Sequence, residues 1–215
     1  MYSLNEIDVT LKRAARGAGM PWGMAEEAGK CARWLEGNGL PGAELLLGLL
    51  TRTDGKDCQT NSPIDTHANV WTAQSGALCP LMAGVAVSDR ANMFIAETSL
   101  SLGTMLSPLA FVPFAASAAK SAGATIEVSW NGATVTVSAD SVSIQAEDAA
   151  LIVQETDAVQ CRSVASDVAN DPARGRIEIA ADVWKALGDL GHRTFAPDTE
   201  ASRLAGAGAG LSDND

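Results

Sequence analysis

The sequence has no dense cluster of basic residues and no long uninterrupted run of apolar ones. Its 215 residues include 15 Lys and Arg against 26 Asp and Glu, which gives a formal net charge of −11. Phosphate backbones and anionic lipid surfaces attract concentrated positive charge, so neither nucleic acid nor a membrane is an expected partner. The longest apolar-rich stretch, residues 105–119, contains two prolines and is too short to span a bilayer.

The four cysteines are scattered, and no two of them form a CxxC pair. In a chain of this size without disulfide-scaffold spacing, reduced thiols in a cytoplasm are the simpler interpretation. Residues 1–17 also lack the apolar core of a secretory signal peptide. We therefore expect a soluble, cytoplasmic protein.

The sequence also lacks a recognisable catalytic motif. The G-x-S-x-G pattern of a nucleophile elbow is absent, and there are only two histidines. Asp65 and His67 have a D-x-H spacing, but zinc sites use three or four ligands at recognisable intervals. We expect no metal and no cofactor.

The N-terminal quarter has the pattern of three helices. Ser3 and Glu6 have the spacing of a capping box, and apolar residues follow at helical intervals as far as residue 18. Pro21 suits the first turn of a second helix. Residues 43–50 are apolar nearly all round, which predicts a third and buried helix.

The sequence predicts the secondary structure of the middle of the chain less clearly. Residues 70–106 are compatible with either strand or helix, because periodicity does not separate the two for short apolar runs. Residues 108–119 have a helical composition, with Pro113 expected to kink the helix.

A β-hairpin is predicted around Asn131-Gly132, a strong two-residue turn signal. This turn places Val128 opposite Val135 and Ile126 opposite Val137, so apolar residues meet at both pairs. The expected product is an antiparallel meander with one covered face.

A second turn, at Asp140-Ser141, is expected to place Val137 opposite Ile144 and to add the third strand of this meander. Trp130, beside the hairpin turn, is expected to be partly exposed. Further strands are predicted at 150–154, 159–162 and 176–179, and a closing helix at 181–190. Helices first and strands later indicate an α+β fold: an N-terminal helical layer, an antiparallel β-meander, a C-terminal helix and a Gly-rich tail. We expect one domain over residues 1–198 and a Gly/Ala-rich docking tail over residues 199–215.

The tail has no core of its own, and too few residues follow its glycines to form the helix of a phosphate loop. Its composition alone favours disorder. We nevertheless expect it to be held on its own domain or on a partner. The residues expected to dock are Glu200, Ser202, Arg203, Gly206, Gly208, Gly210, Asp213 and Asp215.

Several stretches together resemble an uncharacterised bacterial family, a domain of unknown function. They are LNEI at 4–7, RAARGAG at 13–19, WGMAEEA at 22–28, LCP at 78–80, and EASRLAGAGAG at 200–210 with DND at 213–215. The resemblance implies one family-length domain that includes the tail. It implies no reaction, cofactor or catalytic residue.

Two functions stay open. The first is a small subunit or interaction protein of a soluble metabolic complex, with another protein subunit or a second copy of itself as partner and the tail as docking element. The alternative is a small-molecule enzyme or ligand-binding protein with a pocket between the helical layer and the sheet, near Cys79 and Asp89. Cys79 itself is expected to be buried and inert. The absence of a catalytic motif favours the first function.

Overall fold

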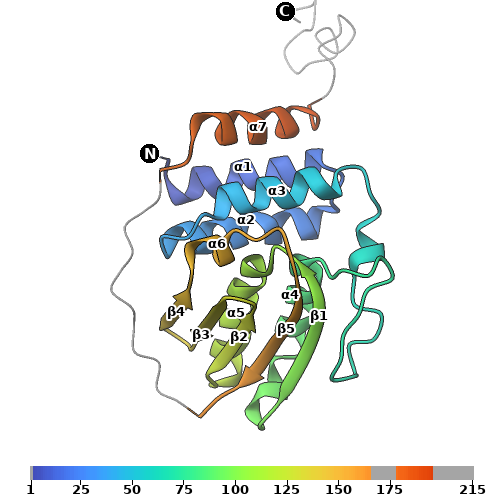
Figure 1. Ribbon diagram of the computed structural model, residues 1–215. Coiled ribbons are helices and arrows are strands. Elements are labelled where there is room, and N and C mark those ends of the chain that lie inside the picture. The colour runs from blue at the N-terminus through green and yellow to red at the C-terminus, as the bar shows by residue number, and fades with distance from the viewer. Residues whose placement is uncertain (1, 166–177, 196–215) are drawn as a thin grey trace, which may run out of the picture.

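The computed structural model describes residues 2–165 and 178–195, and shows a stack of helices beside a sheet (Figure 1). The N-terminal helices are α1 (Leu4–Gly17), α2 (Trp22–Gly37) and α3 (Gly42–Thr53), followed by the short 3₁₀ helix η1 (Cys58–Asn61). The three predicted helices are thereby confirmed. Ser3 caps α1, because its hydroxyl accepts from the backbone N–H of Glu6 (3.2 Å) while the Glu6 carboxylate accepts from the backbone N–H of Ser3 (2.7 Å).

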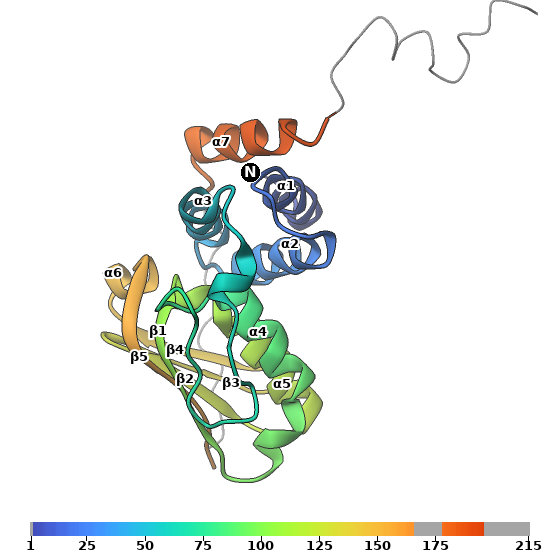
Figure 2. The ribbon, with the colours of Figure 1, turned by 90° about the vertical axis from the view of Figure 1, so that its right-hand side faces the viewer.

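The rest of the chain alternates helices and strands. In order they are α4 (Pro80–Asp89), η2 (Ala91–Ile95), β1 (Ser99–Leu106), η3 (Pro108–Phe111), α5 (Val112–Ala122), β2 (Ile126–Trp130), β3 (Ala133–Val137), β4 (Val142–Ala146), α6 (Asp148–Leu151), β5 (Glu155–Ser163) and α7 (Ala181–His192). Figure 2 shows α7 above α1 and α3, with α2 beneath them and α4 and α5 beside the sheet.

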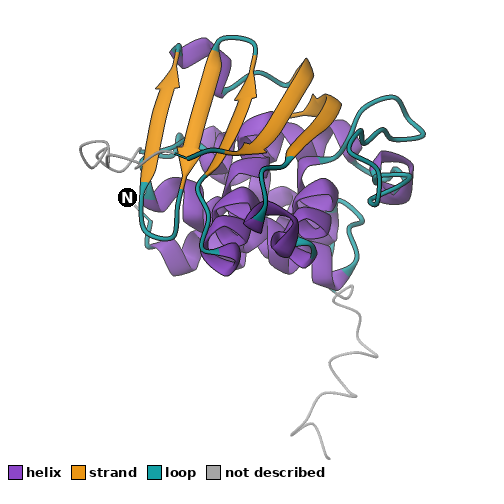
Figure 3. Ribbon diagram, turned by 90° about the horizontal axis from the view of Figure 1, so that it is seen from below, coloured by secondary structure: helices purple, strands orange, loops and turns teal. Residues whose placement is uncertain are grey.

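The strands form one antiparallel sheet in the order β1-β5-β2-β3-β4. Helices α4 and α5 lie against one face of it (Figure 2), and Figure 3 shows the helices gathered on one side of the strands. Val128, Val135 and Cys161 are fully buried on this face, where they join the core that extends into α1, α2 and α3. The fold is α+β, as predicted, and no described helix combines the length and apolarity needed to cross a membrane.

The hairpin register is confirmed, since Val128 pairs with Val135 and Ile126 with Val137. The predicted register of the next hairpin is wrong, because Val137 pairs with Val142 rather than with Ile144. Ser138 donates its backbone N–H to the Ser141 carbonyl (2.9 Å), so the turn is Ala139-Asp140, one residue earlier than expected, and each pairing partner shifts by two residues. A shift of two residues keeps each side chain on its own face, so the shared apolar face survives the error.

Other predictions need correction. Residues 150–154 do not form a strand, because α6 ends at Leu151 and β5 begins only at Glu155. Pro113 is the second residue of α5 and does not kink a longer helix, because a first turn does not use the N–H that proline lacks. Trp130 is 6% exposed, and its indole N–H donates to the carbonyl of Ala150 (2.9 Å).

Three predictions at the C-terminal end have different outcomes. The strand at 159–162 lies inside β5, and the helix at 181–190 is α7. The predicted strand at 176–179 lies partly outside the described residues, and residues 178–180 are not in a strand. The tail at 199–215 lies wholly outside them, so the division into a domain and a docking tail stays a prediction.

Candidate functional site

A mainly apolar groove separates α2 from α4 and α5, and we call it the α2–α4–α5 groove. Its volume is about 810 Å³, within the range of small-molecule sites. Met24 and Trp34 line it from α2, Met82 and Val85 from α4, and Phe114 from α5. The groove therefore lies between the N-terminal helices and the helices that cover the sheet.

Close packing of α4 on α5 shapes the floor of this groove. A Cβ atom at Gly84 would lie 2.3 Å from the ring of Phe114, so only glycine allows the ring to lie there. The Ser88 hydroxyl donates to the Phe114 carbonyl (3.4 Å) and also joins the two helices. The two helices therefore form one rigid wall, and α2 forms the other.

Charged groups lie at the rim of the groove. Glu27 and Lys30 form an ion pair of 2.7 Å on α2, and the hydrogen bond to Glu27 raises the pKa of the Lys30 ammonium. Asp89, the last residue of α4, is exposed and also lines the groove. An apolar floor with a few charges at the edge is the usual composition of a ligand site.

Two buried thiols lie near the groove. Cys31 lines it and donates to the carbonyl of Ala110 (3.3 Å), and burial raises the pKa of its thiol, with a smaller contribution from Cys79. Cys79 is 2% exposed at the N-cap of α4. Burial raises the pKa of the Cys79 thiol to about 11, although the backbone N–H groups of Leu81 and Met82 oppose the shift. Both thiols therefore stay protonated at neutral pH.

We predict slow alkylation of Cys79 in the folded protein. The thiolate is the nucleophile, and a pKa of about 11 leaves little of it at pH 7. Iodoacetamide labelling followed by peptide mapping should modify Cys79 about 100-fold more slowly than in denatured protein. Cys58, which is half-buried, serves as the internal reference. Equal labelling rates at Cys58 and Cys79 would show that Cys79 is accessible and reactive.

The two residues that the sequence placed near one pocket lie at opposite ends of α4. Asp89 lines the groove, whereas Cys79 is buried at the other end of α4, about 15 Å away along a ten-residue helix. The groove residues Met24, Trp34 and Phe114 were not singled out from the sequence as site residues. Their apolar side chains have the same sequence pattern as core residues, so no signal in the sequence distinguished groove residues from core residues.

The remaining sequence-predicted residues have other positions. The Asp65 carboxylate accepts from the backbone N–H of His67 (2.8 Å), which is a local turn. The described residues contain no group of three His, Cys, Asp or Glu side chains that could hold a metal ion. The predicted docking residues Glu200, Ser202, Arg203, Gly206, Gly208, Gly210, Asp213 and Asp215 lie outside the described residues.

A family model described as "Protein of unknown function (DUF3726)" matches residues 2–76, which include α1, α2 and α3. No curated protein and no solved structure matches the chain. The motifs at 78–80 and 200–215 lie beyond the matched residues. Residues 2–76 are therefore similar to an uncharacterised family, a domain of unknown function.

Proposed function

We propose that the protein binds a small, mainly apolar molecule in the α2–α4–α5 groove. The observation that supports the proposal is a groove of about 810 Å³. One of its apolar walls comes from α2, and the other comes from α4 and α5. Burying apolar ligand surface against Met82, Val85 and Phe114 supplies the binding free energy. A polar end of the ligand would meet Lys30 or Asp89 at the rim.

The chemistry of the groove supports binding rather than nucleophilic catalysis. Cys31 is its thiol, and burial keeps that thiol protonated. Its charged residues are Glu27, Lys30 and Asp89, and the first two already neutralise each other. The groove therefore presents a ligand with apolar surface. Among the described side chains, it also has one carboxylate without an ion pair at its rim, that of Asp89.

A second candidate function, that of an interaction protein, is favoured by Trp22. This side chain is 64% exposed at the start of α2, and the Arg16 guanidinium lies 4.8 Å from its ring centroid. Tryptophan and arginine are enriched at protein interfaces. The proposal that the tail docks on the domain or on a partner belongs to this second function.

The test of the first function blocks the groove without disturbing the fold. Val85 is half-buried on α4, so Val85→Trp fills the groove with a large ring. Titration with the apolar dye 1-anilinonaphthalene-8-sulfonate, followed by fluorescence, should give saturable binding to the native protein. We expect Val85→Trp to weaken dye binding by about tenfold or more.

The matched control adds the same ring elsewhere. Ile64 is 69% exposed and does not line the groove, so Ile64→Trp should bind the dye as the native protein does. Thermal melting checks that both variants fold. Unchanged dye affinity in folded Val85→Trp, or an equal loss in both variants, would remove the groove as the binding site.

A further inference from the structure

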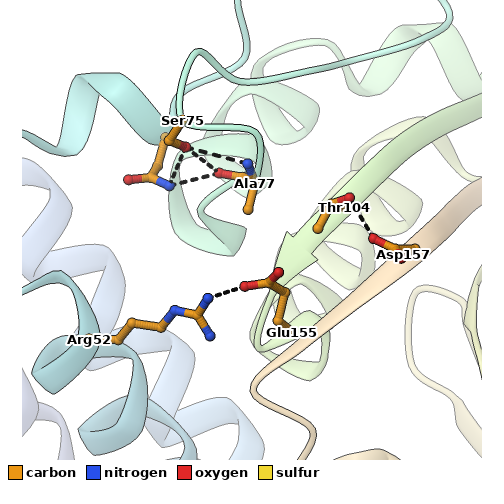
Figure 4. Close-up of polar contacts among 7 residues, drawn as sticks. Arg52, Ser75, Ala77, Thr104, Glu155 and Asp157 are labelled. Atoms are coloured by element: carbon orange, nitrogen blue, oxygen red, sulfur yellow. Dashed lines mark hydrogen bonds and ion pairs between the residues drawn. The ribbon is translucent and has the colours of Figure 1, made fainter.

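A second cavity, of about 480 Å³, lies between the end of α3 and the strands β1 and β5. We call it the polar cleft. Figure 4 shows Arg52 reaching from α3 toward Glu155 at the start of β5, with Asp157 further along β5 and Thr104 on the neighbouring strand β1. The cleft is lined mostly by charged, hydroxyl and amide side chains, in contrast to the groove.

The charges of the polar cleft are segregated between its two walls. Arg52 and Lys56 lie on the wall formed by α3 and the residues after it, while Glu155 and Asp157 lie on β5. Arg52 and Glu155 form an ion pair that joins the walls. Lys56 has no ion pair with any described residue. Among the described residues, the Asp157 carboxylate has no ion pair either, and it accepts from the Thr104 hydroxyl (2.6 Å). Both residues are exposed, so one cation and one carboxylate face the cleft without an ion pair among the described residues.

Backbone irregularities fix the position of Asp157. The β1–β5 ladder is shifted between Gly103 and Met105, so Asp157 and Ala158 form a bulge opposite Thr104. Ala158 has a φ of 57°, and Ser107 is the one other non-glycine residue with positive φ in the described part of the chain. Bulges re-aim side chains, and strained backbone concentrates at functional sites.

The rim opposite the bulge is also held in place. Asn61 is 8% exposed, and its amide nitrogen donates to the Ser75 hydroxyl and to the Ala77 carbonyl, both at 2.7 Å. The Ser75 hydroxyl donates in turn to the Ala77 carbonyl (3.0 Å). This local network fixes the loop that borders the cleft, so the cleft is a preformed feature of the fold.

We infer that the polar cleft binds a small zwitterion of the amino-acid type. The ligand carboxylate lies against Lys56 and Arg52, and its ammonium group lies against Asp157. Charge-assisted hydrogen bonds at both ends hold such a molecule. A ligand with only negative or only positive charge would be repelled by the wall that carries the same charge. This site is separate from the groove and does not depend on the proposed function.

The experiment screens free L-amino acids at millimolar concentration against the native protein by thermal shift. Each compound that raises the Tm is then measured by isothermal titration calorimetry. We expect at least one amino acid to bind, and expect its N-acetyl and methyl-ester derivatives to bind about tenfold more weakly because each lacks one charge. Asp157→Asn and Lys56→Ala should each weaken binding of that amino acid by a similar factor.

Two controls separate this site from the groove and from general charge effects. Asp140→Asn removes an exposed carboxylate outside the cleft and should leave the affinity unchanged. Val85→Trp should also leave it unchanged, whatever its effect on the dye. The inference is overturned if no free amino acid binds, if the N-acetyl derivative binds equally well, or if folded Asp157→Asn keeps native affinity.

Discussion

Val137→Asp should lower the free energy of unfolding by about 4 kcal/mol, enough to unfold a marginally stable protein. Val137 is fully buried and lies between Ile126 and Val142 on the apolar face of the sheet. A carboxylate there has no solvent and no charged partner, so it must either stay protonated or disrupt the packing. Urea denaturation followed by circular dichroism measures the loss.

Thr134→Asp is the matched control for this substitution. Thr134 lies on the same strand but on the other face, between Ser129 and Gln145, and it is half-buried. A carboxylate there keeps contact with water, so the cost should stay below about 1 kcal/mol. Similar losses in Val137→Asp and Thr134→Asp would contradict the assignment of the two faces.

Gly17→Ala should detach α7 from the helical stack and lower the free energy of unfolding by about 3 kcal/mol. A Cβ atom at Gly17 would lie 1.7 Å from the carbonyl oxygen of Leu190, and backbone atoms cannot yield as a side chain does. Displacing α7 exposes Leu187 and Leu190, which are buried against α1 and α3. Limited proteolysis should cut Gly17→Ala near α7 before the rest of the chain.

The matched control for Gly17→Ala is Gly188→Ala, on α7 itself. A Cβ atom at Gly188 meets nothing within 4 Å, and alanine favours a helix interior over glycine by about 1 kcal/mol. Gly188→Ala should therefore raise the stability that Gly17→Ala lowers. If both substitutions changed the free energy of unfolding in the same direction, α7 would not cross α1 at Gly17.

Local signals predicted the parts of the fold that local interactions decide. The capping box at Ser3 and Glu6 marks where α1 begins, and Asn131-Gly132 sets the register of the β2–β3 hairpin. The turn after β3 carries no such dipeptide, and its predicted register was wrong by two residues. The predicted face of each strand residue was still right, because side chains alternate between the two faces and a shift of two residues returns each one to its own face.

The sequence could not predict the parts that depend on distant contacts. Strand β1 alternates serine and leucine over 99–102, but Gly103 and the bulge interrupt the pattern. The polar cleft brings Arg52 to Glu155 across about a hundred residues, and no local spacing signals such a pair. The groove is built from methionine and aromatic side chains that have the same pattern as core residues.

The α2–α4–α5 groove is proposed to hold a small molecule. Native mass spectrometry of the full chain, purified gently from its own cells, tests this most directly. We expect a small molecule bound in stoichiometric amount, lost on mild unfolding and absent from the Val85→Trp variant purified in the same way. A native protein that carries no small molecule and instead keeps a stoichiometric protein partner would contradict the claim and favour the interaction protein.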